Sequence, residues 1–192
     1  IYHAFSSMRN CLLLLPRIHI NLKNNKGLEF VAAAKHFIQL SNKYLDGWTL
    51  HINDNEILNT YIKKEEYISH RDENLKMFLY RAEFVIFFNL SYGVPSFSFN
   101  VWDWSGKLLT LEEVREISLM KIRKGDFYSV VTQQEHPILY QPYFIIHPCH
   151  TAYILASFKK RSRNLIITFL GIITPLIQLN LPLEYGLCEL SD

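Results

Sequence analysis

The stretch YRAEFVIFFNL, residues 80–90, alternates strictly between two sets of side chains. Successive side chains of a β-strand point to opposite faces of a sheet, so this period of two predicts a strand, and its apolar content predicts a central one. The next five residues, SYGVP, predict a turn, after which FSFNV (97–101) continues the alternation in a second strand. The two strands together predict an antiparallel hairpin. The side chains expected on the core face of its first strand are Tyr80, Ala82, Phe84, Ile86, Phe88 and Leu90.

Two tryptophans follow the second strand, one on either side of Asp103, and here the alternation changes its phase. The change predicts a bulge, or the end of the strand, ahead of a turn at Ser105 and Gly106. A pair of exposed tryptophans would form a surface for a partner, whereas a buried pair would belong to the core. We expect Trp102 and Trp104 to lie in the core.

Sequence patterns typical of helices flank this hairpin on both sides. Upstream, Leu28–Asp46 repeats apolar residues at helical spacing, which predicts an amphipathic helix closed by Gly47. Downstream, Thr110 and Glu113 have the pattern of a capping box, which predicts a helix that ends at Gly125. The apolar stripe of the first helix consists of Phe30, Ala33, Ala34, Phe37, Ser41, Tyr44 and Leu45, and that of the second consists of Leu111, Val114, Ile117 and Met120.

The segment from Asn53 to Asn74 separates the first helix from the hairpin and is rich in Asp, Asn, Glu and Lys. Its centre, KKEE at residues 63–66, mixes charges of both signs, which is typical of a solvated surface. We therefore expect a solvated connection here. This interpretation leaves the first strands of the sheet unassigned.

The C-terminal part adds further strands and helices. Phe127–Thr132 predicts a strand, the apolar residues 144–146 predict another, and Ala152–Phe158 predicts a helix. Asn164–Leu183 contains no charged residue and is about as long as a membrane span. Gly, Pro and amide residues interrupt it, so we expect a buried helix followed by an extended segment from Asn180. Consecutive hairpins with helices at the start, the middle and the end predict an α+β fold, an antiparallel sheet flanked by helices.

Composition and charge restrict the domain count and the class of protein. The 192 residues fit one domain, and a hydrophobic fraction of 49% is globular rather than disordered. A net charge of +2 gives no indication of nucleic-acid binding. Cys11, Cys149 and Cys188 form no close pair, which indicates free thiols in a reducing compartment, taken here as the cytoplasm. The apolar run Cys11–Leu15 stops at Pro16 and is short for a secretory signal, so we expect no targeting peptide.

The sequence HPCHT, residues 147–151, joins the predicted strand at 144–146 to the predicted helix at 152–158. A cysteine at such a junction can face solvent. Backbone N–H groups at a helix start and a charged imidazole would stabilise its thiolate, so Cys149 is a candidate nucleophile. The alternative is a small core residue. His136, His147, Cys149 and His150 offer zinc ligands in principle, but their spacing is not that of a familiar zinc module, and we expect no metal.

Three motifs resemble the ubiquitin-like-conjugating enzymes of autophagy, the family of autophagy-related protein ten. They are TQQEHP (132–137), the His-Pro-Cys-x-Thr at 147–151, and LNLPLEY (179–185), and their order and spacing are those of the family. The resemblance implies the ubiquitin-conjugating-enzyme fold, with one catalytic domain over residues 27–192 and an unmatched N-terminal extension over residues 1–26. Tyr140 stands where the resemblance leads us to expect glycine, which predicts an altered loop.

The resemblance also implies the activity and the partners. Cys149 would accept the C-terminal glycine of the ubiquitin-like autophagy-related protein twelve, as a thioester, from the activating enzyme, autophagy-related protein seven. It would pass this glycine to a lysine of autophagy-related protein five, without a metal or a cofactor. The residues expected around the thiol are His147 and His150, which would tune it, and Gln133, Gln134 and His136, which would form a polar shell.

Two other hypotheses stay open at this point. The first is an inactive relative that only binds the acceptor, which the unmatched extension and the unassigned first strands permit. The second is a tail-anchored membrane protein, in which residues 164–183 would span the bilayer.

Overall fold

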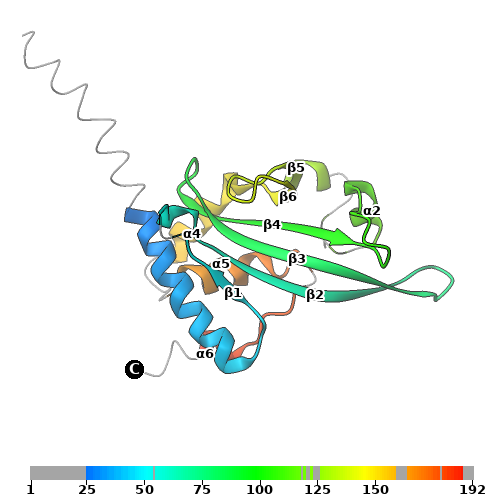
Figure 1. Cartoon of the computed structure of the whole chain (residues 1–192), viewed down its shortest axis with the longest axis horizontal. Helices are drawn as coiled ribbons and strands as arrows, with labels where there is room; N and C mark the ends of the chain where they lie inside the picture. Colours follow the sequence, from blue (N-terminus) through cyan, green and yellow to red (C-terminus); the bar gives the residue numbers. More distant parts are fainter. Residues whose placement is uncertain are drawn as a thin grey trace, which may run out of the picture.

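The computed structural model describes residues 25–53, 55–117, 119, 122, 126–158, 164–177 and 179–187. Its strands form one antiparallel sheet in the order β1-β2-β3-β4-β6-β5 (Figure 1). The strands are β1 (Thr49–His51), β2 (Tyr61–Arg71), β3 (Met77–Asn89), β4 (Val94–Trp102), β5 (Val131–Glu135) and β6 (Pro142–Ile146). The predicted α+β architecture, an antiparallel sheet flanked by helices, is confirmed.

The hairpin predicted from residues 80–101 forms the centre of this sheet. β3 pairs antiparallel with β4, with Phe84 opposite Phe99, and lies between β2 and β4. Leu90 departs from the prediction: it follows the end of β3 and is 43% exposed. The side chains of β3 that do enter the main core are Ala82, Phe84, Ile86 and Phe88, while Val85 and Phe87 pack with Tyr143 and Ile145 in a second cluster. Because their parity along β3 is opposite, the two clusters lie on opposite faces of the sheet.

The expected solvated connection is wrong for residues 61–71, which form β2 between β1 and β3. The charges of this segment have partners within the fold. Lys63 Nζ lies 2.6 Å from a carboxylate oxygen of Glu83 on β3, and Lys64 Nζ lies 2.9 Å from Asp46 Oδ1. Lysines on both faces of β2 thus form ion pairs with carboxylates of the fold. For this reason a segment with charges of both signs can form a strand inside the sheet.

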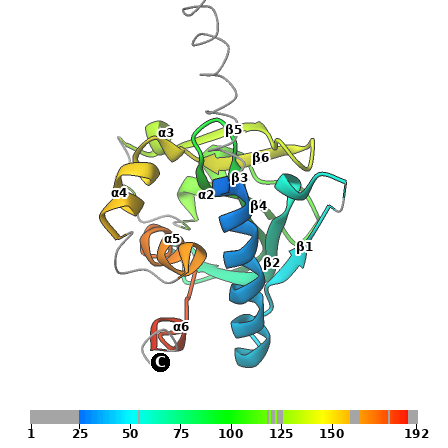
Figure 2. The ribbon, with the colours of Figure 1, turned by 90° about the vertical axis from the view of Figure 1, so that its left-hand side faces the viewer.

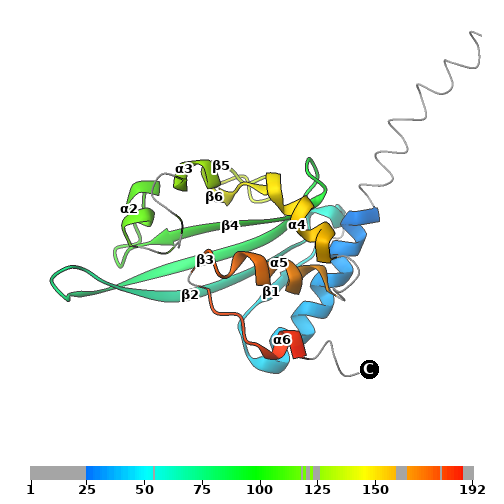
Figure 3. The ribbon, with the colours of Figure 1, turned by 180° about the vertical axis from the view of Figure 1, so that it is seen from behind.

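Helices cover one face of the sheet. The N-terminal helix (residues 25–44) lies on the same side as α4 (Thr151–Phe158), α5 (Leu165–Ile173) and α6 (Glu184–Leu187) (Figures 2 and 3). The first helix is confirmed, but Leu45 does not belong to its buried stripe. This residue follows the helix with a φ of 55° and is 91% exposed. The face that these helices cover is the one that carries the main core.

The C-terminal run from Asn164 forms a buried helix and then an extended segment, as expected. Asn164 caps α5, because its Oδ1 accepts hydrogen bonds from the backbone N–H groups of Ile166 and Ile167, at 2.9 and 3.1 Å. Within the part of the chain that the structure describes, no helix combines the length and the apolar character needed to cross a membrane.

The core placement expected for Trp104 is wrong. β4 ends at Trp102, and the chain then turns through Gly106, which has a φ of 83°. Trp104 lies in this turn and is 90% exposed. Trp102 stays half-buried, with the guanidinium of Arg81 4.1 Å from the centre of its ring.

Between β4 and β6, the end of one predicted helix and the start of one predicted strand also differ from the prediction. The capped helix, α2 (Leu111–Glu116), ends at Glu116, whereas Gly125 and Met120 lie outside the described residues. The strand expected from Phe127 begins instead with a helical turn, α3 (Phe127–Val130), and the extended conformation starts only at Val131.

The predicted capping box at the start of α2 is confirmed, and its contribution to stability can be measured. Thr110 Oγ1 accepts from Glu113 N at 3.2 Å, and Glu113 Oε2 accepts from Thr110 N at 2.7 Å. We expect Thr110→Ala to lower the free energy of unfolding by about 1 kcal/mol, measured by urea titration, because an N–H of the first turn loses its acceptor. Thr110→Ser keeps the acceptor and serves as the control. An equal loss in both variants would contradict this explanation.

Candidate active site

Cys149 lies at the junction of the sheet with a helix. β6 ends at Ile146, a 3-10 turn (Pro148–His150) follows, and α4 begins at Thr151. This is the strand-turn-helix order that the sequence predicts. Cys149 is an exposed, free cysteine, so its thiol is open to a partner molecule instead of being packed in the core.

His147 holds the backbone of the cysteine in place. It is the N-cap of the 3-10 turn, and its Nδ1 accepts a hydrogen bond from Cys149 N at 3.2 Å. The backbone N–H of His147 donates to Val130 O at 2.8 Å, which ties the turn to the start of β5. In this geometry the side chain of His147 orders the turn that carries Cys149.

Tyr92 is a neighbour of this site that the sequence reasoning missed. It lies in the turn between β3 and β4, and its ring meets the ring of His147 edge to face, with centroids 5.8 Å apart. Gly93, with a φ of 65°, gives this turn its shape. The sequence SYGVP indicates only a turn; that this turn reaches His147 follows from the register of β4 against β6, which the sequence does not display.

The two glutamines predicted for the polar shell lie on the edge strand next to the site. Gln133 and Gln134 are exposed on β5, opposite Phe144 and Tyr143 of β6. Successive residues of a strand face opposite ways, so Gln133 lies on the side of the sheet that α4 covers and Gln134 lies on the other side. The side chain of His150 lies outside the part of the chain that the structure describes.

His136 lies in the second cluster, on the face opposite to the helices. Its ring packs between Phe87 and Tyr143, with centroid distances of 4.4 and 5.1 Å. Its Nδ1 accepts from the backbone N–H groups of Ile138 and Leu139, both at 3.2 Å. Burial lowers the pKa of His136 to about 4. These contacts close the turn between β5 and β6, and they keep the ring neutral at physiological pH.

The same turn contains Tyr140, which stands where glycine was expected. Tyr140 has a φ of 52°, in the left-handed region that glycine adopts without strain. Its backbone N–H donates to His136 O at 3.0 Å, and its side chain is 70% exposed. The backbone at residue 140 therefore has a conformation that suits glycine, and the tyrosine that stands there places its ring in solvent.

The buried His136 predicts a measurable pH dependence. Its pKa is about 4 in the folded chain and 6.5 in the unfolded chain, so the unfolded state binds more protons between these values. The free energy of unfolding should therefore fall as the pH drops from about 6.5 to 4, by about 3 kcal/mol in total. His136→Asn keeps an acceptor for the two N–H groups and does not titrate. In urea titrations at pH 7 and pH 4, we expect the variant to lose about 3 kcal/mol less than the parent; identical losses would contradict the assignment.

The chain is similar to proteins of a known family. The model of the family described as "Autophagocytosis associated protein, active-site domain" matches residues 29–184. The human "Ubiquitin-like-conjugating enzyme ATG10" is 30% identical over 186 residues, which cover 92% of this chain and 78% of the human protein. The protein of the same name from Arabidopsis thaliana is 26% identical over 140 residues, covering 64% of this chain and 61% of the plant protein.

A solved structure is also similar. It is titled "Crystal structure of Autophagic E2, Atg10", has 16% sequence identity and a TM-score of 0.48, and the match covers 78% of this chain and 92% of that one. Of the three cysteines in the sequence, only Cys149 falls inside the region that the family model matches.

Proposed function

The chain belongs to the family of the ubiquitin-like-conjugating enzymes of autophagy, and from this premise we propose that Cys149 carries the ubiquitin-like protein as a thioester. The family makes the chain a conjugating enzyme. One observation supports the choice of residue above all: Cys149 is exposed at a strand-helix junction and is the only cysteine within the matched region. We further propose that residues 27–192 form a single catalytic domain, because elements from the N-terminal helix to α6 share one core.

We propose autophagy-related protein twelve as the protein that is carried, with autophagy-related protein seven as the donor and a lysine of autophagy-related protein five as the acceptor. The motifs at 132–137, 147–151 and 179–185 support this choice over other conjugation pathways. The free, exposed thiol of Cys149 supports a reducing compartment such as the cytoplasm.

The proposed chemistry consists of two displacements at the same carbonyl carbon. First, the thiolate of Cys149 attacks the thioester on the activating enzyme; a new carbon–sulfur bond forms and the cysteine thiolate of that enzyme leaves. Second, the neutral amine of the acceptor lysine attacks the new thioester, an amide bond forms, and the thiolate of Cys149 leaves while the nitrogen loses a proton to solvent. A thiolate is a good leaving group, so the enzyme mainly has to orient the amine and the thioester.

His147 is the positioning residue in this proposal. Its ring accepts a hydrogen bond from the N–H of Cys149 and so orders the turn that carries the thiol, and the ring of Tyr92 contacts it from the β3–β4 turn. The histidine acts on the backbone of the turn, so its main contribution is to the rate at which the thioester forms and reacts.

We expect His147→Ala to slow transfer by about 2–10-fold, since one hydrogen bond that orders the nucleophile is lost. His147→Asn should keep most of the rate, because an asparagine side chain accepts from the N–H two residues on in the same way. Single-turnover transfer from the loaded activating enzyme measures both rates. If the asparagine variant were as slow as the alanine variant, another property of the imidazole would be essential instead of the bond to Cys149.

The proposed partners are tested by reconstitution. The chain is incubated with ATP, activating enzyme and either autophagy-related protein twelve or autophagy-related protein eight, and the products are separated with and without reductant. We expect a reductant-sensitive adduct with protein twelve and its transfer to protein five. An adduct with protein eight alone would overturn the assignment of the partner while leaving the thioester role of Cys149 intact. Binding of protein five without any adduct would instead support the inactive relative.

A further inference from the structure

Strand β5 forms one edge of the sheet and begins beside the turn that carries Cys149. Among the described strands it pairs with β6 alone (Figure 2). Its first residue, Val131, lies opposite Ile146, the last residue of β6. Directly beyond this pair, His147 N donates to Val130 O at 2.8 Å, and Cys149 follows in the 3-10 turn. The open edge of β5 therefore leads to the proposed thioester.

Hydrogen bonds at both ends of the β5–β6 pair show which backbone groups face this edge. At the end near the cysteine, Val130 accepts from β6, and at the far end His136 N donates to Gln141 O at 2.8 Å. Bonded and non-bonded pairs alternate along an antiparallel ladder, so the residues of β5 that bond to β6 have even numbers. Three residues of odd number therefore direct their backbone N–H and C=O groups away from β6: Val131, Gln133 and Glu135.

Most of these outward groups have no partner in the described part of the chain. The N–H of Val131 is an exception, because it donates to Phe127 O at the end of α3. No hydrogen bond between described residues reaches the backbone N–H or C=O of Gln133 or Glu135. The side chains of residues 132–135 are polar and exposed. A row of unpaired backbone groups on an edge strand is a template for another extended chain.

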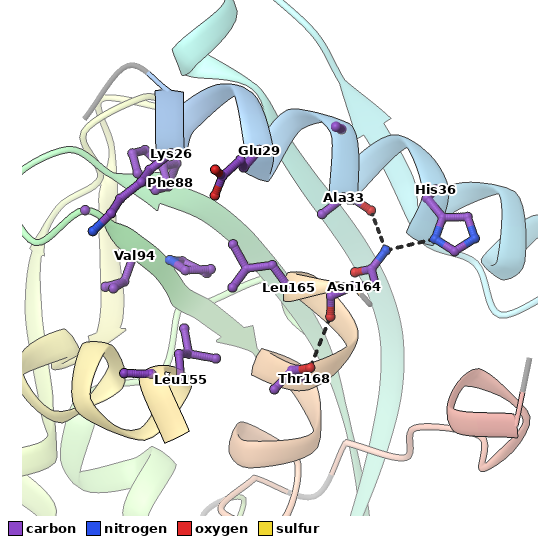
Figure 4. Close-up of a pocket in the computed structure, with 14 residues that line it drawn as sticks. Lys26, Glu29, Ala33, His36, Phe88, Val94, Leu155, Asn164, Leu165 and Thr168 are labelled. Atoms are coloured by element: carbon purple, nitrogen blue, oxygen red, sulfur yellow. Dashed lines mark hydrogen bonds between the residues drawn. The ribbon is translucent and has the colours of Figure 1, made fainter. Parts of the chain in front are cut away.

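A groove on the other side of α4 offers less to an extended chain. It lies between the N-terminal helix, α4 and α5, has a volume of about 650 Å³, and has a floor at Phe88 and Val94 that is already buried (Figure 4). Inside it, Asn164 Nδ2 donates to Ala33 O at 2.9 Å. An extended peptide needs partners for its own N–H and C=O groups. The edge of β5 presents such partners in register, whereas the amide of Asn164 is already bonded.

We propose that the C-terminal tail of the ubiquitin-like protein adds to β5 as a further antiparallel strand. This inference rests on the proposed function, because the last glycine of that tail is the group that Cys149 would carry. The direction follows from the geometry. The end of the tail must lie at Cys149, near Val131, whereas β5 runs from Val131 away to Glu135. In this orientation Gln133 and Glu135 each exchange two backbone hydrogen bonds with the tail.

The tail can pair with β5 and still reach the thiol. Neighbouring strands lie about 4.8 Å apart, so a strand added beyond β5 lies about 10 Å from β6. Three extended residues span about 10 Å. The last few residues of the tail therefore leave the edge at Val131 and cross to Cys149, while the preceding residues stay paired. Pairing holds the thioester in a fixed direction for the attack of the acceptor amine.

Amide hydrogen exchange, resolved by NMR, tests this pairing residue by residue. The full chain with Cys149→Ser is loaded with the ubiquitin-like protein as an oxyester and compared with the same chain unloaded. We expect the exchange of the N–H groups of Gln133 and Glu135 to slow at least about tenfold in the adduct, because they become hydrogen-bonded. The N–H groups of Thr132 and Gln134 face β6 and should exchange at the same rate in both samples.

Ser69 of β2 is the matched control on the opposite part of the sheet. Asp72 N donates to Lys76 O at 3.1 Å, which places the bonds between β2 and β3 at residues of even number. The N–H of Ser69 therefore faces away from β3, beyond the end of β1. Its exchange should not change on loading.

A proline on the edge separates the backbone from the side chain. Gln133→Pro removes one outward N–H and leaves the ladder to β6 in place. In its adduct, the N–H of Glu135 should exchange as fast as in the unloaded chain, whereas Gln133→Ala, which keeps the backbone N–H, should retain the slow exchange. Slow exchange of Thr132 in each unloaded variant verifies that β5 still pairs with β6. Loss of protection in both variants would assign the contact to the side chain of Gln133 and overturn the proposal.

Failure of this docking is distinguishable from failure of the proposed function. A normal adduct on a gel, with Gln133 and Glu135 exchanging as fast as in the unloaded chain, would overturn the docking and leave the thioester role of Cys149 intact. The absence of an adduct in both the parent and the Cys149→Ser chain would remove the function and the docking together. Protection that appears in the unloaded chain as its concentration rises would overturn the proposal and assign this edge to a second copy.

Discussion

Cys149→Ala is expected to abolish the adduct with the ubiquitin-like protein completely, because the residue that forms the thioester is removed. The fold should survive, since Cys149 is exposed and contributes little to the core. The measurement is the adduct band after incubation with ATP, activating enzyme and the ubiquitin-like protein, run without reductant. A normal, reductant-sensitive adduct in the alanine variant would remove Cys149 from the mechanism.

Cys149→Ser sharpens this test. The hydroxyl is a weaker nucleophile than the thiolate and its alkoxide is a poorer leaving group, so an adduct should form slowly and then persist as an oxyester. It should resist reductant and yield to mild alkali. Cys11→Ser and Cys188→Ser are the matched controls, because both cysteines lie outside the region matched by the family model, and both variants should behave like the parent.

The parts of the fold that were predictable are those in which local pattern and burial agree. The period of two over residues 80–90 places Phe84 and Ile86 in the core, and Thr110 with Glu113 caps a helix, as the sequence indicates. Residues 61–71 show where this reasoning fails. Their charged side chains indicate an exposed connection. In the structure, however, Lys64 pairs with Asp46 and Lys63 pairs with Glu83. Such ion pairs form only once segments distant in sequence have come together.

The candidate site divides in the same way. Cys149 and His147 are close in sequence, so their contact follows from local geometry; the strand-helix junction indicated Cys149, and the family resemblance indicated His147 beside it. Tyr92 joins them only through the register of three strands, and no local signal marks it. His136 is predictable as a histidine of the motif at 132–137, but its burial against Phe87 depends on a cluster that no single segment reveals.

The motif LNLPLEY at residues 179–185 predicts one more large effect, on stability. Tyr185 is fully buried and stacks on Phe37 of the N-terminal helix, with ring centroids 5.1 Å apart. Its hydroxyl donates to Asp46 Oδ2 at 2.9 Å, while Asp46 Oδ1 is paired with Lys64 Nζ of β2. Burial raises the pKa of Tyr185, and the carboxylate of Asp46 raises it further, so the phenol remains a donor. One side chain thus ties the last described helix to the first helix and to the sheet.

Tyr185→Ala is expected to lower the free energy of unfolding by about 4 kcal/mol, since it leaves a cavity beside Phe37 and removes the donor to Asp46. Tyr185→Phe keeps the ring and should cost about 1.5 kcal/mol, the lower end for a hydrogen bond to a charged group. Urea titration measures both, and Tyr153→Ala is the control, because Tyr153 is 80% exposed and should change stability by less than about 0.5 kcal/mol. Equal losses in the phenylalanine and alanine variants would assign the whole effect to the hydroxyl and refute the packing role of the ring. Losses no larger than that of Tyr153→Ala would show that the C-terminal motif is not needed to hold the first helix on the sheet.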